Sequence, residues 1–285
     1  MQRHKYSFEA LGTLWSIETN DKLSLALKAT ILARIELFDA TYSRFRKDSL
    51  VTQVSKQPGT YEFPDDAQKL FGFYEKLYNL TDGKVTPLIG DVISRAGYDA
   101  DYSFIPHAQF PTLRWGEILS LDGSALTVKE PTLLDVGAAG KGYMIDIVCG
   151  ILDDNAVVDY VVDASGDLRH KGATENEVGL EHPFDPTKVI GAVDVQNKSL
   201  CASAINKRSW GEGIHHIFDP DTTAPSQEIV ATWVIADEAM VADGLATALF
   251  FTEPRTLKTK YDFEYVRITA KGTVEYSPYF EGKLF

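Results

Sequence analysis

The segment from Asp135 to Asp146 combines glycines, a lysine and a carboxylate in an arrangement that suits a phosphate-bearing ligand. It reads Asp-Val-Gly-Ala-Ala-Gly-Lys-Gly-Tyr-Met-Ile-Asp, and a helix is expected to begin within it. Glycines let the backbone approach a ligand closely, and free amides at the start of a helix favour an anion. Lys141 adds a positive charge, and Asp146 can accept hydrogen bonds from a sugar or a base. The alternative interpretation is a glycine-rich turn that carries a surface lysine.

Two oxygen-bearing side chains interrupt an apolar helix predicted towards the end of the sequence. Asp243 and Thr247 are four residues apart, so they lie on the same face of that helix. A buried carboxylate needs a partner, and a pair of hard oxygen ligands suits Mg²⁺ better than zinc. The alternative interpretation is a hydrogen bond between the two side chains inside the core.

Two further segments place titratable, aromatic or basic residues beside turns. His216 precedes the turn-forming run Asp219–Thr222, where an imidazole can face a cleft. Tyr42–Ser49 mixes aromatic and basic residues, which can stack on a ring and neutralise a phosphate. For the first segment, the alternative is a solvent-exposed histidine pair at a turn. For the second, it is a capping loop in which Asp48 or Ser49 begins a short helix.

Several common enzyme motifs are absent from the sequence. It contains no G-x-S-x-G, H-E-x-x-H or C-x-x-C pattern, which excludes the usual nucleophile elbow and the commonest zinc and thiol-redox motifs. The run Gly137–Gly142 matches neither the Walker pattern nor G-x-G-x-x-G. Cys149 and Cys201 lie far apart, and we expect them to be buried free thiols.

The charge balance excludes one large class of partners. The 285 residues include 28 basic and 41 acidic side chains, which gives a formal net charge of −13. This charge repels a phosphate backbone, so we expect no general binding of nucleic acid. No apolar run approaches the roughly 20 residues of a membrane helix. The sequence shows neither a signal peptide nor a lipid-carrying cysteine near its start. The expected location is therefore cytoplasmic as written, or periplasmic if the chain is a trimmed mature form.

The elements that must position these residues alternate irregularly and include hairpins, which favours an α+β fold over a doubly wound sheet. We expect helices over 22–40, 66–80, 141–152 and 237–251. Asp21 is expected to cap the first of these helices, and Asp237 the last. We expect strands over 8–19, 156–162, 188–195, 199–204, 230–236, 263–269 and 273–277, with a hairpin over 118–129. No repeat or linker is present, so residues 1–285 are expected to form a single unit.

The order of these segments resembles the ApbE family of FAD:protein FMN transferases, which attach FMN to a threonine of a target protein. The most specific elements are Gly-Lys-Gly-aromatic-x-x-Asp and Ala-Asp-x-x-x-Thr. The resemblance spans nearly the whole chain through Leu11–Thr13, Tyr42–Ser49, Thr81–Gly83, Asp135–Asp146, Val162–Asp167, His216–Thr222 and Ala242–Phe250. It implies an ApbE-like α+β unit of mixed sheets and helices, related to the T-fold, with FAD in a cleft between two subdomains.

The resemblance also implies roles for individual residues. Asp243, Thr247 and the backbone carbonyl of Ala138 resemble the Mg²⁺ ligands, with Mn²⁺ as an alternative ion. His216 resembles a histidine that assists proton removal from the acceptor, and Asp219 shapes its turn. The positions that resemble flavin-binding ones are Gly12, Thr13, Phe45, Ala138, Lys141, Asp146 and Asp219. Of these, Phe45 would lie against the isoalloxazine, and Lys141 and Asp146 would hold the phosphate and adenosine portions.

Four positions depart from the family pattern. Thr223 stands where the family usually has glycine after Asp-Pro-x-Thr, and Ser165 replaces the first of two common glycines. Ala139-Gly140 replaces the usual Ile-Ala, and Ala231 stands where serine is often found. The changes at 223 and 231 touch the rim of the implied active site.

The implied reaction breaks the FAD pyrophosphate and moves FMN to a threonine hydroxyl of an acceptor protein, releasing AMP. FAD and the acceptor protein are then the partners of this chain. Two alternatives remain open at this point. The same site would serve hydrolysis of FAD to FMN and AMP, or the binding of FAD without catalysis.

Overall fold

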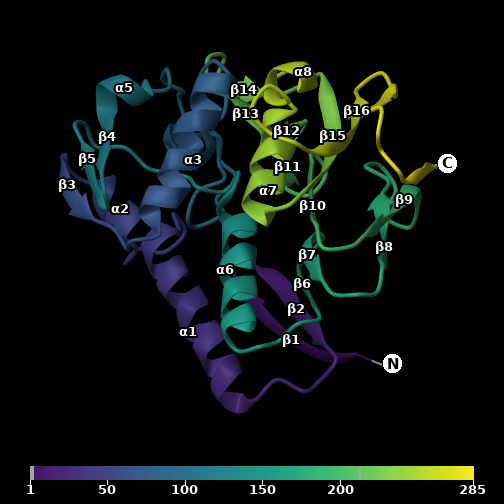
Figure 1. The fold of residues 1–285 in the computed structure, drawn as a ribbon. Coiled ribbons are helices and arrows are strands. Elements are labelled where there is room, and N and C mark those ends of the chain that lie inside the picture. The colour runs from purple at the N-terminus through teal and green to yellow at the C-terminus, as the bar shows by residue number, and fades with distance from the viewer. Residues whose placement is uncertain (1–2, 212) are drawn as a thin grey trace.

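A central sheet of eight strands organises the molecule (Figure 1). The computed structural model describes residues 3–211 and 213–285 of the chain. All neighbouring strands in this sheet pair antiparallel. In spatial order the strands are β1 (His4–Ala10), β2 (Thr13–Thr19), β6 (Tyr160–Ala164), β7 (Asp167–Lys171), β10 (Ser199–Ala204), β15 (Ile229–Ala236), β16 (Glu264–Thr269) and β17 (Val274–Tyr276).

Helices and smaller sheets surround the central sheet. The helices are α1 (Leu25–Tyr42), α2 (Leu50–Val54), α3 (Ala67–Leu80), η1 (Pro87–Ile89), α4 (Gly90–Arg95), α5 (Trp115–Ile118), α6 (Gly140–Asp154), α7 (Ala239–Ala248) and α8 (Pro254–Leu257). One three-stranded sheet has the order β3 (Gly59–Glu62), β5 (Ala125–Val128) and β4 (Leu119–Asp122). A second three-stranded sheet has the order β18 (Lys283–Leu284), β9 (Val189–Val195) and β8 (Asn176–Glu181). Two short hairpins pair β11 (Ser209–Trp210) with β12 (Ile214–His215), and β13 (Phe218–Asp219) with β14 (Ala224–Pro225).

Both faces of the central sheet are buried. On β15, Val234 packs in a cluster with the helices, whereas its neighbour Trp233 packs with Leu180 and Val193 of β8 and β9. Successive residues of a strand point to opposite faces, so these contacts define two layers on the sheet. Figure 1 shows this arrangement, with α6 and α7 adjacent in the middle of the view and β8 and β9 at its right. The α+β fold predicted from the sequence is confirmed.

The predicted strand over 8–19 is a β-hairpin in the structure. Strands β1 and β2 pair from His4 with Thr19 to Ala10 with Thr13. Leu11 and Gly12 form the turn, with φ of +51° and +71°. Two successive positive φ angles are typical of the type I′ hairpin turn, which favours glycine. The alternation of residue types was correct, but it does not reveal the reversal of the chain at Leu11-Gly12.

Other boundaries differ from the prediction for local reasons. Helix α1 begins at Leu25 because the hydroxyl of Ser24, rather than Asp21, accepts a hydrogen bond from the Leu27 amide at 3.1 Å. Strand β6 begins at Tyr160 because Ala156 has a φ of +57°, which interrupts an extended backbone. The remaining expected elements are confirmed within about two residues, apart from α7, which spans Ala239–Ala248 and not 237–251. Both cysteines are buried and free.

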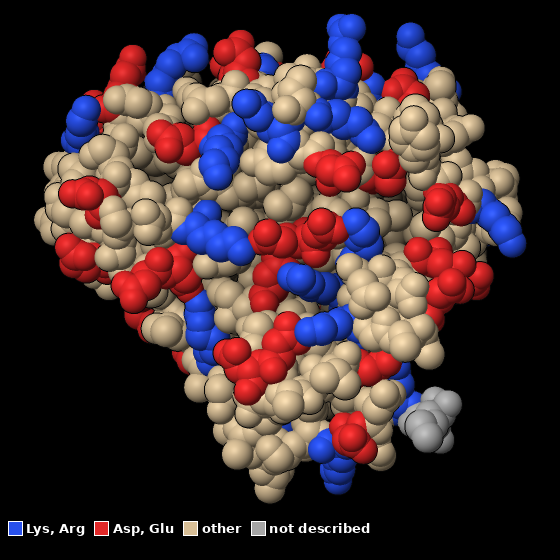
Figure 2. Space-filling view, in the orientation of Figure 1, with Lys and Arg blue, Asp and Glu red and all other residues tan. Residues whose placement is uncertain are grey.

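The described residues include no helix that combines the length and apolar character needed to cross a membrane. Figure 2 shows Lys, Arg, Asp and Glu side chains interspersed over the face in view, without a single large basic patch.

Candidate active site

A cavity of about 1010 Å³ lies beside the start of α6 and the Asp243–Thr247 face of α7. This volume is at the upper end of the range for small-molecule sites. Eight residues singled out from the sequence line it: Gly12, Thr13, Phe45, Ala138, Lys141, His216, Asp243 and Thr247. The structure thus brings together residues that are more than 200 positions apart in the chain.

Two buried carboxylates and a lysine form the polar centre of the cavity. Asp243 Oδ2 accepts a hydrogen bond from the Gly142 amide at 2.8 Å, and Lys141 Nζ lies 2.5 Å from Asp167 Oδ2. Burial and the charge of Asp167 raise the pKa of Asp243. Burial alone would lower the pKa of Lys141, but the charges of Asp167 and Asp243 outweigh it and raise that pKa. Lys141 is therefore a permanent positive charge between two acidic groups.

The first turn of α6 is more occupied than the sequence predicts. Gly140 N donates to Val136 O at 2.7 Å, and Gly142 N donates to Asp243. A Cβ at position 142 would lie only 2.2 Å from Ala239 O, so glycine is needed for the close approach of α6 to α7. The predicted cradle of free amides is thus wrong at positions 140 and 142, and Lys141 is the main positive group of the segment.

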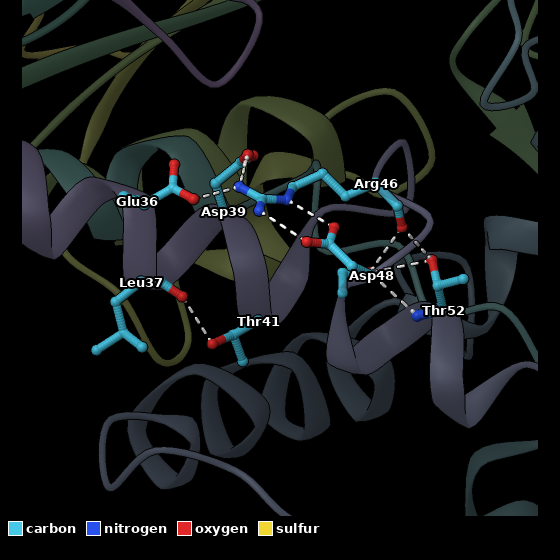
Figure 3. A network of polar contacts seen from close by, with 8 residues as sticks. Glu36, Leu37, Asp39, Thr41, Arg46, Asp48 and Thr52 are labelled. Atoms are coloured by element: carbon cyan, nitrogen blue, oxygen red, sulfur yellow. Dashed lines mark hydrogen bonds and ion pairs between the residues drawn. The ribbon is translucent and has the colours of Figure 1, made fainter.

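The loop that carries Phe45 is held by one arginine. Figure 3 shows Arg46 reaching three carboxylates, at 2.6 Å from Glu36, 3.1 Å from Asp39 and 3.0 Å from Asp48. The hydroxyl of Ser49 accepts a hydrogen bond from the Thr52 amide at 3.2 Å and caps α2. The segment is therefore both a capping loop and a part of the cavity wall.

Aromatic rings and a buried arginine surround Phe45. The guanidinium carbon of Arg44 lies 4.2 Å from the centre of the Phe45 ring, and the Tyr102 ring stacks on Phe45 at 5.3 Å. Arg44 Nε also lies 2.5 Å from Asp135 Oδ2, which joins this loop to the glycine-rich segment. Burial would raise the pKa of Asp135, but the charge of Arg44 and the hydrogen bond from Gly137 outweigh it and lower that pKa. These contacts fix the Phe45 ring at the cavity.

His216 stands in the cavity wall as a neutral imidazole. Its backbone amide donates to Arg208 O at 3.2 Å, and its Nδ1 lies 3.4 Å from the same oxygen. A carbonyl only accepts hydrogen bonds, so Nδ1 carries the proton and Nε2 keeps a free lone pair. Burial and the charge of Arg208 lower the pKa of His216 to about 3. The imidazole is therefore neutral at pH 7, and its Nε2 lone pair can accept a hydrogen bond.

The lowered pKa predicts a pH effect on stability. Between its unfolded pKa of 6.5 and its folded pKa of about 3, His216 binds a proton only in the unfolded chain. The free energy of unfolding therefore falls as the pH falls through this window. Replacing His216 with glutamine should reduce that slope by up to about 1.4 kcal/mol per pH unit. Urea unfolding of both proteins at pH 7, 6 and 5 measures the slopes, and parallel curves would contradict the prediction.

Asp146, predicted to contact the adenosine portion of FAD, does not line the cavity. Its carboxylate accepts hydrogen bonds from the amides of Ala239 (3.0 Å) and Met240 (2.8 Å) and forms an ion pair with Arg169. These are the first amides of α7, so Asp146 caps that helix from 93 residues away. This remote cap also explains why the helix begins at Ala239 without Asp237. The contacts give Asp146 a structural role.

Asp146→Asn should destabilise the protein by about 2–4 kcal/mol, because the variant loses a buried ion pair and part of a helix cap. The change in urea unfolding free energy measures this effect. Asp153→Asn is the matched control, since its pair with Lys171 is well exposed at both side chains, and it should cost about 1 kcal/mol or less. Equal stability of Asp146→Asn and the unmodified protein would contradict the capping role.

Asp219 also lies outside the cavity lining, and it shapes the turn after His216. Its Oδ1 accepts a hydrogen bond from the Asp221 amide at 2.8 Å. Lys84 Nζ binds both Asp219 oxygens, at 2.7 and 2.8 Å, and lies 2.8 Å from Asp221. Asp219 thus positions the turn as expected, and its side chain is already occupied within the protein.

The sequence interpretation missed two charged residues of the cavity. Asp167 and Arg208 both line it, although neither was assigned a role. The segment Val162–Asp167 was part of the resemblance, and the nearly complete burial of Asp167 shows why it matters. Arg208 had no sequence pattern that distinguished it from other surface arginines.

Comparison with known proteins identifies the family of the chain. The model of the ApbE family matches residues 11–263. The chain belongs to the ApbE family. The FAD:protein FMN transferase of Vibrio cholerae is 25% identical to it over 84% of this chain and 78% of that protein. The protein of the same name from Haemophilus influenzae is 26% identical over 86% of this chain and 76% of its own length.

Solved structures share the fold of this ApbE-family chain. The ApbE protein of Thermotoga maritima superposes with a TM-score of 0.84 at 22% identity and covers 97% of both chains. The flavin transferase ApbE from Vibrio cholerae superposes with a TM-score of 0.78 at 20% identity and covers 98% of both. The ApbE-like fold predicted from the sequence is therefore confirmed.

Two departures from the ApbE pattern coincide with unusual backbone angles. Thr223 and Ser165, where the resemblance leads us to expect glycine, have φ angles of +51° and +56°. The left-handed region favours glycine and disfavours side chains branched at Cβ. Ser165 gains a hydrogen bond from its hydroxyl to Leu14 O at 3.0 Å. Thr223 is β-branched, and its side chain makes no hydrogen bond to the described residues, so its strain is uncompensated.

Thr223→Gly should stabilise this ApbE-family protein by about 0.5–1.5 kcal/mol, because it removes left-handed strain at a β-branched residue. Thr222→Gly is the matched control, since Thr222 has no positive φ and the added chain freedom should destabilise the variant. Thermal unfolding of the two variants measures the difference. A lower unfolding temperature for Thr223→Gly than for the unmodified protein would contradict the prediction.

Proposed function

We propose that this protein transfers FMN from FAD to a threonine hydroxyl of an acceptor protein and releases AMP. The observation that carries the proposal is the meeting of Phe45, Lys141, His216 and Asp243 on one cavity. Membership of the ApbE family and the names of the relatives, FAD:protein FMN transferases, support it. Because this cavity draws residues from almost the whole chain, we also propose that the chain acts as one unit.

The donor set beside Asp243 fits a divalent cation. Asp243 and Asp167 are both almost fully buried, and the one cation that contacts this pair, Lys141, lies 2.5 Å from Asp167 Oδ2. Within residues 3–211 and 213–285, no group of three or more His, Cys, Asp or Glu side chains is placed to hold a metal. We propose that Asp243 holds Mg²⁺, or Mn²⁺, together with two neutral oxygens, the Thr247 hydroxyl and the Ala138 carbonyl. When bound, the ion would offset the negative charge of the pyrophosphate.

The residues of the chain have separate tasks in the proposed reaction. The Phe45 ring offers a flat surface for the isoalloxazine, and Lys141 places a positive charge near the phosphates. The threonine oxygen forms a bond to the FMN phosphorus, and the bond from phosphorus to the AMP oxygen breaks. His216 Nε2 takes the hydroxyl proton. The negative charge of bound FAD raises the pKa of His216 from its low value, which makes it a stronger base.

Intact-mass measurement of an acceptor tests the proposed function. The protein is mixed with FAD, MgCl₂ and a candidate acceptor protein, and separately with a variant of that acceptor whose target threonine is valine. A mass gain equal to FMN less one water, seen only with the threonine, supports transfer. AMP release without a mass gain would indicate hydrolysis instead. Bound but unchanged FAD would indicate a binding protein, and either result would overturn the proposal.

A further inference from the structure

Arg208 differs from the other positively charged residues that line the cavity. Five of these residues contact a carboxylate within 4 Å, and the pairs are Arg44–Asp135, Arg46–Asp39, Lys84–Asp219, Lys141–Asp167 and Lys207–Glu181. Across 3–211 and 213–285, Arg208 forms no ion pair, and its guanidinium makes no hydrogen bond. Within these residues, no protein group occupies its five donors.

Arg208 is an exposed residue of the cavity wall and lies beside His216. It follows β10, and its carbonyl oxygen holds the backbone amide of His216 at 3.2 Å. Its positive charge contributes to lowering the pKa of His216 and of Asp135, two groups on different walls of the cavity. A cation that lines the cavity, acts on both groups and has no acidic partner among the described residues would attract an anion bound there.

Resting on the proposed function, we propose that Arg208 is a catalytic residue that binds the non-bridging oxygens of the phosphoryl group during transfer. As the threonine oxygen bonds to phosphorus and the AMP oxygen leaves with the bonding electrons, His216 receives the hydroxyl proton. The guanidinium matches two phosphate oxygens in its fork-like geometry and stays charged throughout. Lys141 is less suited to this task because Asp167 already occupies it at 2.5 Å.

The size of the effect follows from the chemistry of phosphoryl transfer. An arginine that contacts the transferred group typically contributes about 10³–10⁵-fold to the rate. It contributes less to binding, because FAD is also held by its rings and other phosphate contacts. Loss of Arg208 should therefore reduce the rate of transfer much more than the affinity for FAD.

Single-turnover transfer by Arg208→Gln tests the proposal, with saturating FAD and MgCl₂. We expect a rate at least 10²-fold below that of the unmodified protein and a Kd for FAD, read from flavin fluorescence, within about fivefold. Arg208→Lys should transfer FMN at an intermediate rate, because lysine keeps the positive charge but lacks the fork-like geometry of the guanidinium. Lys198→Gln is the control: it removes a positive charge at an exposed position outside the cavity lining, where the lysine pairs with Asp237, and it should change the rate by less than about twofold.

Chemical rescue separates a contact with the substrate from a structural role. Guanidinium chloride at a concentration that leaves the fold intact should raise the transfer rate of Arg208→Ala at least tenfold, whereas urea at the same concentration should not. A rate for Arg208→Gln within twofold of the unmodified protein overturns the role of Arg208, as does a failure of rescue. If the unmodified protein neither transfers FMN nor cleaves FAD, the proposed function fails and this inference fails with it. If the unmodified protein does transfer FMN, the proposed function stands, and the rates of the variants test the role of Arg208 separately.

Discussion

Asp243→Asn should reduce FMN transfer by at least about 10³-fold and leave the protein folded. The carboxylate is the only charged member of the proposed metal site, so its loss removes the main attraction for Mg²⁺. The asparagine oxygen can still accept the hydrogen bond from the Gly142 amide that joins α6 to α7. The measurement is the transfer rate as a function of MgCl₂ concentration, with intact mass as the readout.

Stability separates this prediction from a merely structural role of Asp243. Burial and the charge of Asp167 raise the pKa of Asp243, so a charged carboxylate at this position opposes folding when no cation is bound. In the presence of EDTA, Asp243→Asn should unfold at the same or a higher temperature than the unmodified protein. Asp237→Asn, at an exposed position before α7, is the control and should keep normal transfer. Normal turnover by Asp243→Asn would exclude the proposed metal ligand.

His216→Gln should lower the rate of FMN transfer by about 10²–10⁴-fold, the usual contribution of a general base. Its affinity for FAD should change little, because the imidazole acts on the acceptor hydroxyl in the proposed reaction. Transfer rates measured by intact mass and FAD binding measured by flavin fluorescence separate the two effects. His107→Gln, on an exposed loop, controls for loss of a histidine. A large loss of FAD affinity with an unchanged rate constant at saturation would instead assign His216 to binding.

The order and type of most elements follow from the sequence because local patterns determine them. Alternating residues and turn-forming dipeptides predicted β4, β5, β10 and β15 nearly to the residue. The errors occur where a distant group decides the structure. Helix α7 starts at Ala239 because Asp146 reaches its first amides from α6. No pattern near residue 239 could reveal that contact.

The residues of the site also fall into two groups, those that local motifs predict and those that only the folded structure reveals. Lys141, His216 and Asp243 belong to short motifs, and the structure places all three on one cavity. Asp167 and Arg208 were missed because their importance depends on what surrounds them. One is buried beside Lys141, and the other is a cation without an acidic partner among the described residues. A sequence shows which charges exist, whereas burial and pairing appear only in three dimensions.

The pairing of β2 with β6 has a consequence for the synthesis of the protein. Trp15 and Ile17, both fully buried in the finished fold, pair with Ala164 and Val162. Those partners leave the ribosome about 150 residues later, which at roughly 5–20 residues per second is a delay on the order of 7–30 s. During that time the nascent hairpin exposes two large apolar side chains that the finished fold buries. The turn at Gly12 lines the same cavity as Thr247, which is made near the end of synthesis. The cavity is therefore complete only when nearly the whole chain has left the ribosome.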